Sequence, residues 1–196
     1  ASLWRGLLNW TGGLGIVFVA MIFLPIMRVG GMQLFRAESF DTFGKVLPRA
    51  TDIAKGLVQV YLILSVVVVL TYAALGMTPL DAIVNAMGTV STGGFSSADA
   101  SFTKYQGAAE DFGAVFMICA ALPYVRYVQL LRGQAGPLLR DEQVRFFLRA
   151  LAIGVGIATV WGILHEGASP ESAFRESLFN LASISTGTGF FSGSFP

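Results

Sequence analysis

The chain has 196 residues, of which 54% are apolar and only 13% are charged. A soluble domain carries roughly 25% charged residues, so this composition indicates a membrane protein rather than a soluble one. The net charge of +1 gives no sign of nucleic-acid binding, and the single cysteine, Cys119, excludes a disulfide within the chain.

Runs without charged residues predict where the chain crosses a membrane. The run from Gly6 to Met27 has 22 residues, and the run from Gly56 to Leu80 has 25. Both reach the roughly 20 residues that a helix needs to cross about 30 Å of hydrocarbon. Two further runs, Phe112 to Leu131 and Phe146 to His165, are each interrupted by one arginine. We therefore expect four spans.

The interrupting arginines, Arg126 and Arg149, lie toward the same side of the membrane. On a straight helix, Arg126 lies about 21 Å beyond Phe112, where its long side chain reaches the headgroups. A functional charge inside the membrane is the less favoured interpretation. Pro25 and Pro123 also lie within spans and are expected to kink or end their helices.

The basic residues gather in two loops. Residues 28–55 and 126–149 hold ten of the 13 lysines and arginines, five in each loop. The opposite side holds only Arg5, Lys104 and Arg175, beside seven acidic residues. The positive-inside rule therefore places both basic loops in the cytoplasm and the segments around residues 96–106 outside.

A short phrase occurs twice on the outer side, each time after an apolar segment. The copies are Val90-Ser91-Thr92-Gly93-Gly94-Phe95 and Ser185-Thr186-Gly187-Thr188-Gly189-Phe190. They align with a shift of 95 residues and no gap, and Asn85 and Asn180 precede them at the same distance. Irregular backbone at membrane depth is tolerated only where it is buried in protein or lines a wet cavity. Rings of such carbonyls replace the hydration shell of potassium in pores, so the phrases indicate a cation pathway.

The residues around the first copy predict a complete structural unit. A helix from about Asp52 to Leu75 is followed by a break at residues 76–79 and a short helix to about Val90, too short to span. The phrase and a returning helix then follow, as in one potassium-channel subunit. Asp81 lies near the positive end of the short helix, where it is expected to act as a cap; alternatively, its charge concentrates cations at the pore mouth.

At these residues the sequence resembles the Trk/Ktr/HKT superfamily of potassium transporters, and within it the bacterial TrkH branch. Four motifs carry the resemblance in the order typical of the family and together cover nearly the whole chain. They are Trp10-Thr11-Gly12-Gly13-Leu14-Gly15, Gly30-Gly31-Met32-Gln33-Leu34-Phe35-Arg36-Ala37-Glu38, Asp81-Ala82-Ile83 leading to Thr89–Ser96, and Ser185 to Phe190.

The resemblance implies an all-α membrane protein with four units of helix, pore half-helix, filter loop and helix, arranged pseudo-fourfold around one pore. This chain is then expected to be a fragment of a longer protein. Residues 1–28 would be the last helix of the first unit and 52–131 the complete second unit. Residues 146–196 would be the first helix and pore loop of a truncated third unit, and 29–51 and 132–145 would be cytoplasmic linkers.

The implied function is potassium uptake across the bacterial inner membrane, by a channel-like or an ion-coupled route. The implied site is a selectivity filter that holds potassium by backbone carbonyls, with Gly94 and Gly189 as its fixed glycines and no cofactor. Its expected residues are Ser91, Thr92, Gly93, Gly94, Thr186, Gly187, Thr188 and Gly189. The implied partners are a second copy of the full protein, a cytosolic ring of nucleotide-binding subunits and the lipid bilayer.

The alternative is a membrane assembly subunit that conducts nothing and uses its glycine-rich hairpins only for helix packing. Gly12, Gly13 and Gly15 are expected to have that packing role in either case. No nucleophile–base pair, phosphate-binding loop or catalytic carboxylate pair is evident, so we do not expect an enzyme. His165, the one histidine, lacks nearby partners for a metal and is expected at the membrane interface.

Overall fold

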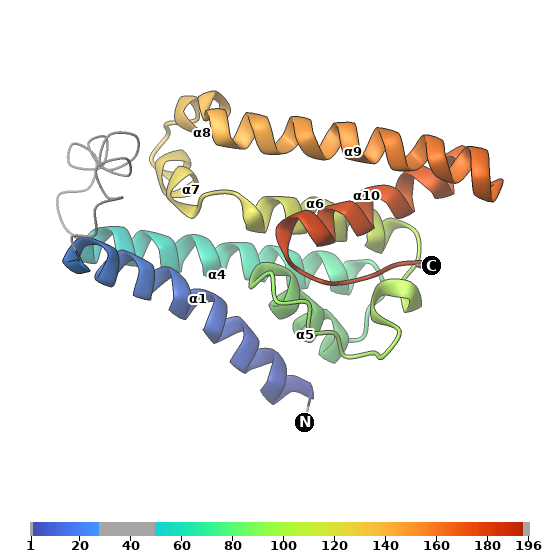
Figure 1. The fold of residues 1–196 in the computed structure, drawn as a ribbon. Coiled ribbons are helices and arrows are strands. Elements are labelled where there is room, and N and C mark those ends of the chain that lie inside the picture. The colour runs from blue at the N-terminus through green and yellow to red at the C-terminus, as the bar shows by residue number, and fades with distance from the viewer. Residues whose placement is uncertain (1, 28–49, 194–196) are drawn as a thin grey trace.

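The computed structural model describes residues 2–27 and 50–193, although the side chains of residues 16–27, 50–53 and 166 are not described (Figure 1). Every regular element within these ranges is a helix, which confirms the expected all-α class. In chain order they are α1 (Ser2–Met27), α4 (Ala50–Ala74), α5 (Pro79–Val90), the 3-10 helix η2 (Ser101–Lys104), α6 (Ala108–Ala121), α7 (Tyr124–Leu131), α8 (Gly136–Arg140), α9 (Glu142–Glu166) and α10 (Pro170–Thr186).

Two stretches of the chain have the same order of elements. The long helix α4 is followed by the short helix α5 and a loop, and the long helix α9 is followed likewise by α10 and a loop. Both short helices begin with a proline directly after a capping hydroxyl residue, Thr78 before Pro79 and Ser169 before Pro170. Proline fits this position because the missing N–H would have no partner in the first turn. The predicted break and the short helix ending at Val90 are confirmed.

The predicted spans agree with the helices in three of four cases. Ala54–Ala74 in α4 and Glu142–His165 in α9 are long and apolar enough to cross a membrane. The first predicted run, Gly6 to Met27, lies within α1. The third predicted span differs, because Phe112 to Leu131 is divided between α6 and α7, which meet at an angle of 92°.

Proline explains this bend. α6 ends at Ala121, and Leu122 has the extended backbone that a following proline favours. Pro123 lacks the N–H needed to continue the helix, so the prediction that it kinks or ends the helix is confirmed. The expectation of a straight helix past Arg126 is wrong. Arg126 lies on α7, where its guanidinium pairs at 2.8 Å with Asp141, the N-cap residue of α9.

Packing joins the two stretches through one apolar core. α5 packs against α1 and α4, while α10 packs against α9 and α6, so the loops that follow α5 and α10 lie close together (Figure 1). Gly113 on α6 permits this packing, since a Cβ there would lie 3.0 Å from the Phe179 ring and 3.2 Å from the Phe102 ring. The largest fully buried apolar side chains come from α4, α5, η2, α6 and α10: Val68, Tyr72, Val84, Val90, Phe102, Met117 and Phe179.

The expected packing role of the α1 glycines is confirmed for only one of them. A Cβ on Gly13 would lie 2.8 Å from the Cβ of Ser91 and 3.0 Å from the Tyr61 hydroxyl. Gly12 and Gly15 have no described atom within 4 Å of that position. Gly13 therefore brings α1 against the end of α5.

The orientation can be tested with introduced cysteines. Ser101 is a poor labelling site because it is buried, whereas Ala100 and Leu139 are exposed. In a Cys119→Ala background, a membrane-impermeant thiol reagent added to intact cells is expected to label a cysteine at Ala100 and spare one at Leu139. The positive-inside rule gives this order. Labelling at Leu139 but not at Ala100 would contradict the predicted orientation. As a control, the reagent should label both cysteines equally in opened cells.

Candidate functional site

The two repeated phrases form loops at the ends of the short helices. We call residues 91–95 the first loop and residues 186–190 the second loop. Ser91 is the C-cap of α5, and Gly187 is the C-cap of α10 with a left-handed backbone. Two predicted site residues thus lie at helix ends: Ser91, whose carbonyl accepts a bond from the Thr92 hydroxyl at 2.8 Å, and Thr186, the last residue of α10.

Positive backbone φ angles recur at equivalent places in the two loops. They occur at Thr92 (50°) and Gly94 (64°) in the first loop and at Gly187 (75°) and Gly189 (84°) in the second. Each pair is related by the shift of 95 residues seen in the sequence. An L side chain rarely adopts this conformation, so three of the four places hold glycine. The sequence repeat is therefore also a repeat of backbone conformation.

The amide groups of both loops turn back toward their own helix. The N–H groups of Gly93 and Gly94 donate to the carbonyl of Gly88, at 3.0 and 3.3 Å. In the second loop the N–H groups of Thr188 and Gly189 donate to the carbonyl of Ser183, at 2.9 and 3.4 Å. These donors and acceptors again correspond under the same shift.

The carbonyl groups of the loops behave differently from the amides. Among the residues that the structure describes, none donates a hydrogen bond to the carbonyls of residues 92–95 or 187–190. A backbone carbonyl is a strong acceptor and normally finds a partner, whether a protein donor, water or a cation. The carbonyls of both loops therefore lack a hydrogen-bond donor among the described residues.

Close contacts bring the two loops together. The carbonyl oxygen of Thr188 occupies the place where a side chain at Gly94 would begin. On its other side the first loop meets α1, because the amide of Asn9 occupies the corresponding place beside Gly93. The structure thus brings the predicted glycines of the two loops, Gly94 and Gly189, close together. Asn9 was not predicted, and its only signal is a polar residue near the start of an apolar run.

A buried asparagine forms hydrogen bonds with the segment that follows each loop. The side-chain oxygen of Asn85 accepts a bond from the Ser96 hydroxyl at 2.9 Å. Asn180 bonds both backbone groups of Ser192, accepting from its N–H at 3.0 Å and donating to its carbonyl at 2.9 Å. The sequence placed these asparagines at equivalent positions, and the structure shows that both hold the segment that follows the loop.

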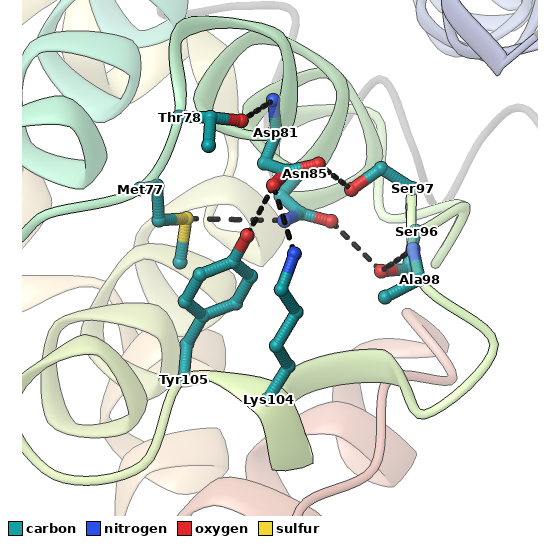
Figure 2. Close-up of polar contacts among 9 residues, drawn as sticks. All are labelled: Met77, Thr78, Asp81, Asn85, Ser96, Ser97, Ala98, Lys104 and Tyr105. Atoms are coloured by element: carbon teal, nitrogen blue, oxygen red, sulfur yellow. Dashed lines mark hydrogen bonds and ion pairs between the residues drawn. The ribbon is translucent and has the colours of Figure 1, made fainter.

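Asp81 holds the same segment after the first loop, as Figure 2 shows. Its carboxylate accepts bonds from the Ser97 hydroxyl at 2.5 Å, the Lys104 ammonium at 3.2 Å and the Tyr105 hydroxyl. These bonds lower the pKa of the Asp81 carboxyl far below its ordinary value, with Ser97 the largest cause and Tyr105 the second. The expectation that Asp81 caps α5 is wrong, because Thr78 is the N-cap and accepts a bond from the Asp81 N–H.

Titratable side chains give no second candidate site in the described ranges. No group of three histidine, cysteine, aspartate or glutamate residues there could hold a metal ion. His165 stacks on Trp161 with 3.7 Å between ring centroids. Glu110, buried on α6, accepts bonds from the Ser192 hydroxyl and from the Gly107 N–H.

Comparison with known proteins finds relatives over nearly the whole chain. The Trk system potassium uptake protein TrkI of Halomonas elongata is 40% identical over 199 residues, covering 99% of this chain and 40% of that protein. The Trk system potassium uptake protein TrkH of Vibrio parahaemolyticus is 35% identical, covering 95% of this chain and 40% of that protein. The chain therefore spans about 40% of the length of these curated relatives.

A solved structure and a family model complete the comparison. The crystal structure of the potassium transporter TrkH from Vibrio parahaemolyticus superimposes with a TM-score of 0.82 and 29% identity, over 97% of this chain and 39% of that one. A family model described as TrkH, cation transport protein, matches residues 1–192. The match confirms the resemblance seen in the motifs and, since the family is one of transporters, the prediction that the chain is not an enzyme. The chain thus belongs to the TrkH family of cation transport proteins.

Proposed function

We propose that the full protein takes up potassium as the pore-forming subunit of a Trk-type system, with potassium held by backbone carbonyls of the two loops. The observation that carries the proposal is that the carbonyls of residues 92–95 and 187–190, at equivalent places in the two loops, have no hydrogen-bond donor among the described residues. Carbonyl rings of this kind replace the hydration shell of potassium. Of the predicted filter residues, Thr92, Gly93, Gly94, Gly187, Thr188 and Gly189 would supply carbonyls directly, while Ser91 and Thr186 would anchor the loops to their helices.

The proposed pore has four such units, of which this chain supplies two loops. The contact between Gly94 and the Thr188 carbonyl supports placing the two loops side by side around one axis. On this proposal residues 52–131 form the second unit, including the bent pair α6 and α7. Residues 1–28 close the first unit, and 146–196 open the third.

The partners follow from the same proposal. The relatives are named as proteins of a Trk system, which fits an assembly with further subunits. We propose a homodimer in the bacterial inner membrane that contacts a cytosolic ring of nucleotide-binding subunits through the linkers 29–51 and 132–145. The first linker lies almost wholly outside the described residues. The second includes α8, whose residues are mostly exposed.

Ion competition tests the proposed function. The unmodified full-length protein, expressed in cells that lack other potassium uptake, is expected to restore growth at low potassium and to take up rubidium. Unlabelled potassium should compete nearly as well as rubidium, and sodium at least about threefold less well, because neutral carbonyls compensate sodium poorly for its lost hydration. The preference should be modest because the two loops differ in sequence. Uptake no greater than in cells without the protein would favour the non-conducting assembly subunit.

A further inference from the structure

The segment after the first loop reaches across to the second loop. The N–H of Phe102, in η2, donates to the carbonyl of Phe191 at 3.1 Å. In return the N–H of Phe191 donates to the Ser101 hydroxyl at 3.2 Å. Phe191 directly follows the second loop, so two hydrogen bonds join segments that lie 90 residues apart in the chain.

Aromatic packing strengthens the same junction. The Phe102 side chain is fully buried, with its ring centroid 4.9 Å from that of Phe190 in the second loop and 5.0 Å from that of Phe179 on α10. It also contacts Tyr72 on α4, with 5.7 Å between centroids. Phe102 thus packs against residues of both stretches, Tyr72 in the first and Phe179 and Phe190 in the second.

The backbone at Ser101 carries strain that an ordinary turn would avoid. Its φ angle is 50°, in the left-handed region that a residue other than glycine rarely adopts. Strain of this kind persists only where the surrounding structure holds it, and it tends to occur at functional sites. Here it places the Ser101 hydroxyl against the Phe191 N–H and the Phe102 ring in the core.

We propose that Ser101 and Phe102 are positioning residues that set the second loop relative to the first and so tune the ion preference of the pore. We call these two residues, with Phe191, the inter-loop clamp. Asp81 and Asn85 fix the clamp to the first loop, because their side chains hold Ser96 and Ser97 before the clamp and Tyr105 after it. Displacement of the clamp therefore changes the spacing between the carbonyls of Gly94 and Thr188 without removing any filter residue.

The test uses the full-length protein and rubidium uptake with sodium competition. Ser101→Ala removes the hydroxyl while leaving the backbone strain, and Ser101→Gly removes both. Each is expected to raise the apparent KM for rubidium about three- to tenfold, as the loss of one buried hydrogen bond allows, and to make sodium a stronger competitor. The matched control is Thr103→Val. Its hydroxyl, in the same 3-10 helix, is buried without a partner among the described residues, so both measurements should stay near wild type.

Three results would overturn the proposal. One is a Ser101→Ala protein present in the membrane with wild-type KM and wild-type sodium competition. Another is a Thr103→Val protein whose KM and sodium competition change as much as those of Ser101→Ala. Any change in η2 would then have the same effect, and Ser101 would have no specific role. If the Ser101 variants do not reach the membrane, Phe102→Leu, which keeps an apolar side chain, is measured in their place. Wild-type ion competition in Phe102→Leu is the third result that would overturn the proposal.

The inference rests on the proposed function, so a filter variant is measured in parallel. If Gly94→Ala changes ion competition and Ser101→Ala does not, the proposed role of the inter-loop clamp is wrong, while the proposed filter is supported. If the unmodified protein does not distinguish rubidium from sodium, the proposed function itself fails.

Discussion

Replacing Gly94 by alanine in the full-length protein is expected to lower rubidium uptake, measured as Vmax/KM, by roughly tenfold or more. Two effects combine. A φ of 64° costs an L-residue about 1–2 kcal/mol, and the new methyl group would lie where the Thr188 carbonyl oxygen now is. The second effect moves a carbonyl of the neighbouring loop, so sodium competition should also strengthen. Larger side chains at this position should abolish uptake.

Two matched glycines separate these effects. Gly167, the C-cap of α9, has a φ of 63° and no described atom within 4 Å of its Cβ position, so Gly167→Ala adds the strain alone, away from the loops. It should reduce stability but leave ion competition unchanged. Gly189→Ala adds strain inside the second loop without a described clash and should have an intermediate effect. Equal ion competition in all three variants would contradict the assignment of Gly94 to a filter.

Much of the fold could be predicted because it depends on local signals. Uncharged runs predicted the long helices α1, α4 and α9, of which α4 and α9 are long and apolar enough to cross a membrane, and the residues around Pro79 predicted the start of α5. The bend between α6 and α7 was predicted only in part, since Pro123 predicts a kink but not its angle. The structure shows an angle of 92° and, on α7, a pair of Arg126 with Asp141, which lie 15 residues apart. Composition and periodicity contain no information about such a pair.

The loops were found from the sequence because they repeat, and their glycines fell where the structure has positive φ. The contacts that hold them were not found. Asn9 and Ser101 have no repeat partner or motif that marks them. Asp81 was noticed, but its position near a helix start suggested a cap, which in the structure is Thr78. Helix-end rules describe only local bonds, whereas the Asp81 carboxylate accepts hydrogen bonds from residues 16 to 24 positions further along the chain.

Replacing Asp81 by asparagine is expected to destabilise the full-length protein and raise its KM for rubidium. The substitution weakens three bonds to a carboxylate, and bonds to charged groups contribute about 1.5–3 kcal/mol each when buried. Tyr105→Phe removes one of them and should give a smaller fall in Tm. Lys104→Gln should give the smallest, because the Lys104 side chain is 52% exposed and exposed ion pairs contribute about 0.2–1 kcal/mol.

The pH dependence should distinguish the carboxylate from its surroundings. Because the pKa of Asp81 is lowered in the folded protein, its stabilising effect is complete above the ordinary carboxyl pKa and is lost only as the pH falls toward the lowered value. The difference in Tm between wild type and Asp81→Asn should therefore be constant from about pH 7 to pH 5 and shrink only below about pH 4. A difference that shrinks steadily from pH 7 would show that another group is responsible.

The sign of the KM changes decides between an anchor and an electrostatic role for Asp81. An anchor predicts that Asp81→Asn and Lys104→Gln both raise the KM, the second only slightly, because both loosen the segment behind the first loop. A charge that concentrates cations predicts opposite signs, since Lys104→Gln would leave the carboxylate uncompensated and lower the KM. It also predicts that the effects fade with added salt, because exposed charges are screened within about 10 Å at 0.1 M. Uptake measured with both variants at low and high ionic strength therefore separates the two roles, and the hydrogen bonds from Ser97 and Tyr105 favour the anchor.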